Sequence, residues 1–144
     1  MRRRKMSFEC TLFDLDVGDG PGGRLQRVVP RHVDTDPVTG KTLNVSFVRY
    51  AAGSQPGSKL RLPMEPINAG RCDGIRAGGW VLDLVWRLPV FASGERVPHC
   101  LLVDLRGKRI GDKVYAGEIV LPEGIRLRKV REDLAVCKIV GNRM

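Results

Sequence analysis

The sequence predicts an all-β protein made of two small β modules. Short apolar segments rich in Val, Ile and Leu alternate with segments rich in Gly, Pro and Asp, which is typical of strands separated by turns. The longest apolar run falls well short of the 18 residues that a membrane-spanning helix needs. The small-residue segment 51–58, AAGSQPGS, predicts a boundary. We therefore expect one module over 1–52, a linker over 53–58 and a second module over 59–144.

The first module is predicted to consist of short strands and tight turns. Alternating apolar residues predict a strand within 7–17, where a change of parity predicts a bulge or burial on both faces. The loop GDGPGG and a short strand ending at Pro30 follow. Asp36-Pro37 begins a turn that Gly40 can end with a positive φ. From Thr42 a hairpin arm alternates, with Asn44 on its polar face.

The second module is predicted to contain more strands. Two prolines within 59–67 predict an edge strand, and the glycine-rich segment 68–79 is predicted to cross between strands. Residues 80–91, WVLDLVWRLPVF, are predicted to form one strand rather than a helix, because β-branched and aromatic residues dominate. We expect its two tryptophans in the core or at a subunit contact. Further strands are predicted over 101–105, 114–120, 125–127 and 134–140.

The charge predicts a polyanionic partner. The chain of 144 residues carries a net charge of +9, which favours nucleic acid first and a membrane surface second. Arginine supplies 18 of the 25 basic residues. Its planar fork matches phosphate oxygens better than an ammonium group does, although codon bias explains the preference for arginine equally well.

No catalytic, metal or cofactor site is predicted. The four cysteines lack the close pairs of a zinc site, which predicts free thiols in a reducing compartment. Asp34 and Asp36 resemble a metal-binding pair, but a turn explains them better. The glycines of GDGPGG match a dinucleotide-binding pattern that requires a helix after the loop, whereas a strand is predicted there. His32 and His99 lie far apart in the sequence, which leaves an enzyme as a weaker hypothesis.

The second half resembles a known family over about residues 58–141. Its landmarks, in order, are Gly74-Ile75, Gly78-Gly79, Leu88-Pro89-Val90, Val97-Pro98, Val103-Asp104-Leu105, Ile110-Gly111-Asp112 and Leu121-Pro122-Glu123-Gly124. Their order and spacing resemble the C-terminal β domain of the large-subunit ribosomal protein L-twenty-five family in its longer form, general stress protein CTC. The first half is similar to the end of that family's N-terminal barrel, at residues 36–41 and 45–49.

The resemblance implies a fold and a function. It implies a partial, truncated N-terminal β-barrel of the 5S-rRNA-binding type, followed by a C-terminal β domain. It also implies a structural constituent of the large ribosomal subunit that binds 5S rRNA, large-subunit rRNA and neighbouring ribosomal proteins at the central protuberance, with no membrane or small-molecule partner. We expect a mitochondrial ribosome, with the bacterial cytoplasm as the alternative. A non-ribosomal RNA-binding module of the tRNA-anticodon-binding type is the competing hypothesis.

The candidate RNA-binding residues are mostly cations, because phosphate and sugar receive half or more of the hydrogen bonds that proteins make to nucleic acids. Asn44 is the candidate for a base or ribose contact. The dense basic segment at 126–131 either forms a second patch or blocks pairing along a strand edge. The full set is Arg2, Arg3, Arg4, Lys5, Arg31, His32, Lys41, Asn44, Arg49, Arg126, Arg128, Lys129 and Arg131.

Overall fold

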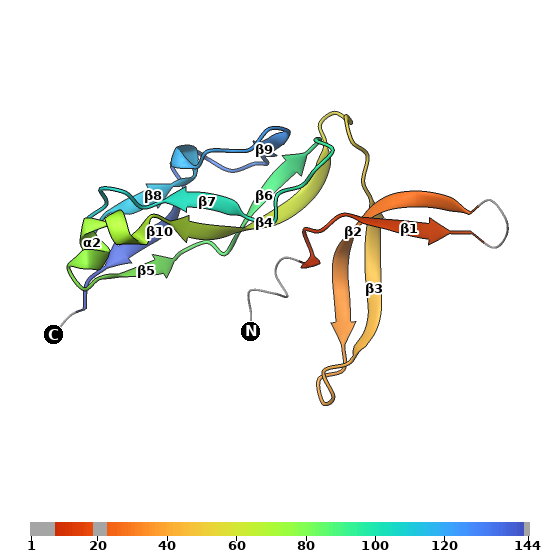
Figure 1. The fold of residues 1–144 in the computed structure, drawn as a ribbon, viewed down its shortest axis with the longest axis horizontal. Coiled ribbons are helices and arrows are strands. Elements are labelled where there is room, and N and C mark those ends of the chain that lie inside the picture. The colour runs from red at the N-terminus through yellow and green to blue at the C-terminus, as the bar shows by residue number, and fades with distance from the viewer. Residues whose placement is uncertain (1–7, 19–22, 143–144) are drawn as a thin grey trace.

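The computed structural model describes residues 8–18 and 23–142, and over these residues the protein is nearly all β. Figure 1 shows a body of short strands from which a long two-stranded arm extends. The predicted all-β fold class is confirmed. The division into two domains stays a prediction, and β4 begins at Ser58, the last residue of the predicted linker.

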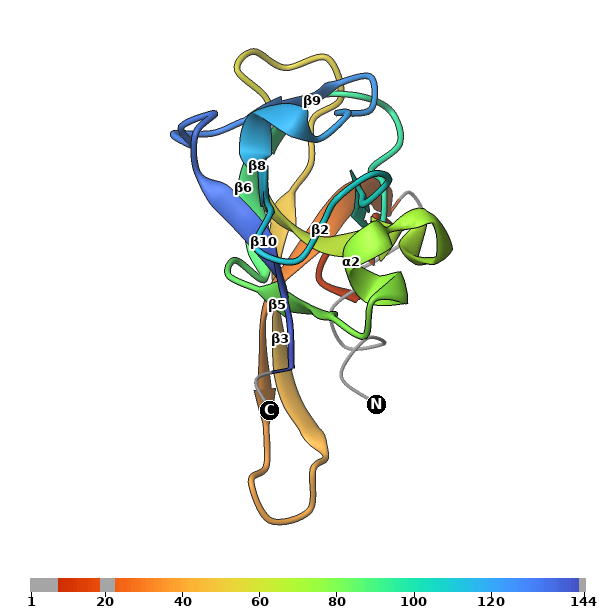
Figure 2. The ribbon, with the colours of Figure 1, turned by 90° about the vertical axis from the view of Figure 1, so that its left-hand side faces the viewer.

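The arm belongs to a three-stranded antiparallel sheet in the order β1-β2-β3. Its strands are β1 (Phe13–Val17), β2 (Arg24–Thr35) and β3 (Thr42–Arg49). The predicted end of the second strand at Pro30 is wrong, because β2 continues for five more residues. Register shifts between Pro30 and His32, which leaves Arg31 as an extra residue in a bulge. Figures 1 and 2 show the outer halves of β2 and β3 projecting from the body.

The turn at the tip of the arm forms as predicted. Asp36 Oδ1 accepts hydrogen bonds from the backbone N–H groups of Val38 at 2.8 Å and Thr39 at 3.3 Å. These bonds lower the pKa of the exposed Asp36 carboxyl, the Val38 bond most strongly. Gly40 has a φ of +69°, a conformation that glycine adopts without steric cost.

The body contains a four-stranded sheet in the order β7-β4-β6-β9. Its strands are β4 (Ser58–Ile67), β6 (Arg87–Ala92), β7 (Leu101–Asp104) and β9 (Ile125–Leu127). The predicted edge position of β4 is wrong for the strand as a whole. The first half of β4, to Pro63, pairs with β6, and the second half, from Met64, pairs in parallel with β7. Each half of β4 therefore pairs with a neighbouring strand on one side only. This arrangement accommodates the prolines, because proline has no N–H to donate to a second strand.

A second body sheet has the order β5-β10-β8, with strands β5 (Trp80–Asp83), β8 (Lys113–Tyr115) and β10 (Ala135–Val140). The predicted single strand over 80–91 is wrong, because the chain bends after Asp83 and β6 joins the other sheet. At the bend, the N–H groups of Leu84 and Val85 both donate to the carbonyl of Val136. Trp80 and Trp86 are 50% and 57% exposed, so they do not lie in the core, and the alternative of a subunit contact stays a prediction.

Short helices fill the remaining connections. The predicted crossing over 68–79 contains η1 (Ala69–Arg71) and α2 (Asp73–Arg76). The predicted strand over 114–120 ends early, because η2 (Ala116–Glu118) follows β8. There the Glu118 side chain turns back to accept the N–H of Tyr115 at 2.7 Å, which closes a helical turn instead of extending the strand.

One apolar core joins the arm to the body. The largest fully buried side chains lie in the body, among them Leu62, Leu88 and Ile139. Cys10 and Tyr50, which flank the arm sheet, are buried in the same cluster. The four cysteines, which all lie among the described residues, form no disulfide with one another, and burial raises the pKa of the Cys10 thiol to about 11. The base of the arm is therefore a packed junction.

Candidate nucleic-acid interface

One face of the β4-β6-β9 sheet is strongly basic. Side chains alternate between the two faces of a strand, and residues paired across strands share a face. The register pairs Lys59 and Arg126 with Phe91, pairs Arg61 with Pro89, and pairs Arg87 with Pro63.

Arg128 continues the same face beyond the end of β9, because its N–H donates to the carbonyl of Pro89 at 3.0 Å. Five cations thus share this surface, which we call the basic sheet face: Lys59, Arg61, Arg87, Arg126 and Arg128. The opposite face of these strands is apolar and packs into the core. One acid of β4, Glu65, has the same parity, but it lies in the half of β4 that pairs with β7.

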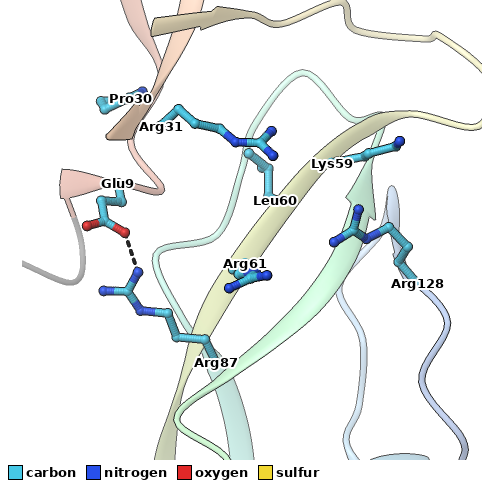
Figure 3. A pocket seen from close by; sticks show the side chains of 8 residues that line it. All are labelled: Glu9, Pro30, Arg31, Lys59, Leu60, Arg61, Arg87 and Arg128. Atoms are coloured by element: carbon cyan, nitrogen blue, oxygen red, sulfur yellow. Dashed lines mark hydrogen bonds and ion pairs between the residues drawn. The ribbon is translucent and has the colours of Figure 1, made fainter. Parts of the chain in front are cut away.

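The arm adds a further cation to this face. Arg31 is the bulged residue of β2, and a bulge redirects its side chain relative to the rest of the strand. Figure 3 shows its guanidinium reaching from the arm toward Leu60 and Lys59. A pocket of about 310 Å³ lies between the arm and the body, and we call it the junction pocket. It is lined by Glu9, Pro30, Arg31, Lys59, Leu60, Arg61, Arg87 and Arg128.

Glu9 is the one acid in the lining of the junction pocket within the part of the chain that the structure describes. It forms an ion pair with Arg87, drawn as the dashed line in Figure 3. Both side chains are about 30% exposed, so the pair is partly shielded from solvent. Within residues 8–18 and 23–142, the side chains of Arg31, Lys59, Arg61 and Arg128 have no carboxylate partner. The pocket therefore carries a strong positive charge.

The predicted residues of the arm lie apart from one another. Lys41 is at the tip, Asn44 lies in the outer part of β3, and Arg49 is at its inner end. His32 Nε2 lies 2.7 Å from Asp34 Oδ1, so an ion pair forms when the imidazole is protonated. All of these side chains are exposed. The arm offers polar and cationic groups along its length but no enclosed site.

Of the cations predicted to form a patch at 126–131, Arg126 and Arg128 lie on the basic sheet face. Arg126 Nη2 donates to Gln55 Oε1 at 3.1 Å and to the Pro56 carbonyl at 3.0 Å, which ties it to the connection between the sheets. Arg131 lies 3.0 Å from Asp133.

Lys129 has a left-handed φ of +51° and is exposed. Of the four predicted cations in this segment, Arg128 lines the junction pocket. Arg2, Arg3, Arg4 and Lys5 lie outside the described residues.

Three cations of the junction pocket were missed from the sequence: Lys59, Arg61 and Arg87. The signal for the first two was present, since the segment at 59–62 reads Lys-Leu-Arg-Leu and alternates cation with leucine. A strand with this pattern has one basic and one apolar face. Arg87 could not be assigned, because its strand was predicted to be continuous with β5.

The dinucleotide-binding interpretation depends on a helix after the glycine-rich loop. The glycine-rich loop joins two antiparallel strands, and β2 rather than a helix follows it, so the dinucleotide-binding interpretation is wrong. Among residues 8–18 and 23–142, no three His, Cys, Asp or Glu side chains gather as metal ligands. None of the helices in this part of the chain is long and apolar enough to cross a bilayer.

Comparison with known proteins adds the family. Residues 58–143 match the family described as "Ribosomal protein TL5, C-terminal domain". The chain belongs to this family. The matched residues contain every strand from β4 to β10, and the resemblance to the L-twenty-five family is confirmed.

Relatives extend the similarity to the arm. "Large ribosomal subunit protein bL25" of Rhodospirillum rubrum is 33% identical over 139 residues, which is 96% of this chain and 63% of that protein. The protein of the same name from Rhizobium meliloti is 31% identical over 93% of the chain and 63% of its own length. That of Methylorubrum extorquens is 32% identical over 81% of the chain and 49% of its own length. The chain thus spans about half to two thirds of these relatives.

Proposed function

We propose that this protein is a structural constituent of the large ribosomal subunit that contacts rRNA through phosphates. The observation that carries the proposal is the basic sheet face beside the arm, in a chain with a net charge of +9. Lysine and arginine surfaces bind RNA by neutralising phosphates and releasing counterions, which requires no base sequence. The name shared by the relatives supports the ribosomal setting. The role is one of binding and assembly, without catalysis.

Sedimentation tests this proposal. The chain, tagged and expressed in a bacterial host, is followed through a sucrose gradient of the ribosomal subunits. We expect it in the large-subunit fractions, and we expect a high-salt wash to release it because phosphate contacts weaken with salt. Recovery at the top of the gradient, or with free tRNA, would contradict the proposal. Recovery with tRNA would favour an anticodon-binding type of module.

We further propose 5S rRNA as the specific partner, contacted by the exposed arm at the central protuberance. Support comes from the similarity of residues 36–49 to the family's 5S-binding barrel and from the exposed positions of Lys41, Asn44 and Arg49. A gel-shift assay with 5S rRNA and an unrelated RNA of equal length tests the preference. We expect tighter binding to 5S rRNA, and Asn44→Ala should reduce the difference between the two RNAs. Equal binding of both RNAs would refute the preference.

The compartment is a separate proposal. The sequence favoured a mitochondrial ribosome, whereas the relatives compared come from bacteria, which favours a ribosome of the bacterial cytoplasm. We propose the bacterial location for this reason. Fractionation of the source cells with an antibody against the chain distinguishes the two, because a mitochondrial protein would pellet with the organelle.

A further inference from the structure

We propose that the junction pocket binds the sugar-phosphate backbone of an RNA strand that passes between the arm and the body. The inference rests on the proposed function, since it names the part of the RNA and the residues that hold it. The site differs from the predicted contacts along the arm. Its cations come from both halves of the chain: Arg31 from β2, Lys59 and Arg61 from β4, Arg87 from β6, and Arg128 from the segment after β9.

The charge of the pocket favours an anionic ligand. Neighbouring cations on one sheet face repel one another, which destabilises the folded protein. Glu9 offsets the charge of Arg87 and leaves four cations of the lining without a carboxylate among the described residues. An anion that enters the pocket removes this repulsion and gains charge-assisted hydrogen bonds, which are stronger than neutral ones.

The shape and lining favour a phosphate group over a base. Figure 3 shows the guanidinium groups of Arg31 and Arg128 reaching toward β4 from the arm and from the segment after β9, with the side chains of Lys59 and Arg61 on β4 itself. The arginine forks match the oxygens of a phosphodiester, and the lysine adds a point charge. Among the described residues, the lining contains no aromatic ring on which a base could stack. The site therefore binds phosphate groups without selecting a base.

The pocket lies where the arm meets the basic sheet face of the body, so that one RNA strand can contact both. Cys10 Sγ lies 3.2 Å from the carbonyl of Arg61, and the Glu9–Arg87 pair lies beside it, so the segment before β1 is fixed against the floor of the pocket. Tyr50 fixes the other side of the arm's base, donating its hydroxyl to the Gly94 carbonyl. A backbone phosphate held here contacts Arg31 of the arm and the body at once.

The test compares two variants with equal loss of charge. The pocket variant carries Arg61→Gln and Arg128→Gln. The control variant carries Arg76→Gln and Arg109→Gln, two exposed arginines outside the pocket. Binding of each protein to a 20-nucleotide oligouridine is measured from 50 to 300 mM KCl.

The slope of log Kd against log salt changes by about 0.7 for each lost contact with a single strand. We expect the pocket variant to lower the slope by about 1.4 for two contacts. At 100 mM salt it should also weaken binding by about tenfold or more, since each lost phosphate contact removes a favourable term. The control variant should change the slope much less.

A charge-preserving variant distinguishes an effect of lost charge from an effect of misfolding. Replacing Arg61 and Arg128 with lysine keeps the charge and should keep most of the salt slope. The melting temperature of the glutamine variant should not fall, because it loses repulsion and no intramolecular side-chain bond seen in the described residues.

The outcomes separate this inference from the proposed function. If the parent chain binds with a steep salt dependence and the two glutamine variants behave alike, the pocket inference is wrong and the general function stands. If the parent chain does not bind the oligonucleotide, both are overturned. Pocket-dependent binding to phosphatidylglycerol vesicles without binding to RNA would also overturn the inference. Binding of inorganic phosphate to the pocket with the same affinity as the oligonucleotide would overturn it as well, since a free anion would then suffice.

Discussion

Gly74 tests the packing of the body most sharply. It is buried in α2, and its backbone forms two hydrogen bonds, donating to Lys108 O and accepting from Gly79, each at 2.9 Å. A Cβ at this position would lie 2.7 Å from Ile139 Cγ2, 2.8 Å from Ile110 N and 2.9 Å from the carbonyl carbon of Arg109. Two of these three atoms belong to the backbone, which cannot move aside as a side chain does.

The expected cost of Gly74→Ala follows from these contacts. Ordinary van der Waals contact begins at 3.4 Å, so the backbone segments must separate by about half an ångström or more. Overpacking of this kind costs about 1–3 kcal/mol. With a urea m-value of about 1–3 kcal/mol/M, the unfolding midpoint should fall by roughly 1 M.

Gly70 provides the matched control for this prediction. It lies in η1 of the same crossing segment, and a Cβ there meets no atom within 4 Å. Gly70→Ala should leave stability unchanged or raise it by about 0.4–1 kcal/mol, because alanine restricts the unfolded chain. Equal urea midpoints for the Gly74 and Gly70 variants would refute the close packing of α2 against the body.

Two further predictions concern hydrogen bonds. Tyr50→Phe removes the 2.5 Å bond to the Gly94 carbonyl at the base of the arm and should lower the free energy of unfolding by about 1–3 kcal/mol; an unchanged urea midpoint would contradict this role. Glu118 bonds to Lys108 Nζ at 2.7 Å, and this bond above all lowers the pKa of its carboxyl from 4.5. The contribution of this bond to the free energy of unfolding is present above pH 4.5 and is lost as the pH falls through the lower pKa that Glu118 has in the folded protein. Glu118→Gln should therefore destabilise the protein at pH 7 and make progressively less difference below pH 4.5, and a pH-independent difference in urea midpoint would refute the pairing.

Much of the fold follows from local patterns that the sequence displays. The turn at Asp36 and Gly40 and the strand at 125–127 were predicted because side-chain capping, positive φ and short apolar runs are local signals. The break after Asp83 was missed because the residues on both sides of it are apolar and share one alternation. Only the pairing of β5 with β10, and of β6 with β4, distinguishes two strands there.

The sequence predicted what kind of ligand the candidate site binds, but not which residues form the site. Net charge and arginine content predicted a surface for a polyanionic partner, nucleic acid first, and Arg31 and Arg128 were among the residues chosen. Their convergence depends on a bulge in β2 and on the register of β9 with β6, both of which are set by long-range pairing. A basic run such as 126–131 suggests one patch, yet its side chains divide among a loop contact, an ion pair and the pocket.

The most direct test of the central claim is a cryo-electron microscopy map of the large ribosomal subunit with this chain bound. We predict RNA backbone density against Arg61 and Arg128, with the arm extending along a second RNA segment. A map in which the basic sheet face is open to solvent or covered by protein, with no RNA phosphate beside it, would contradict the account.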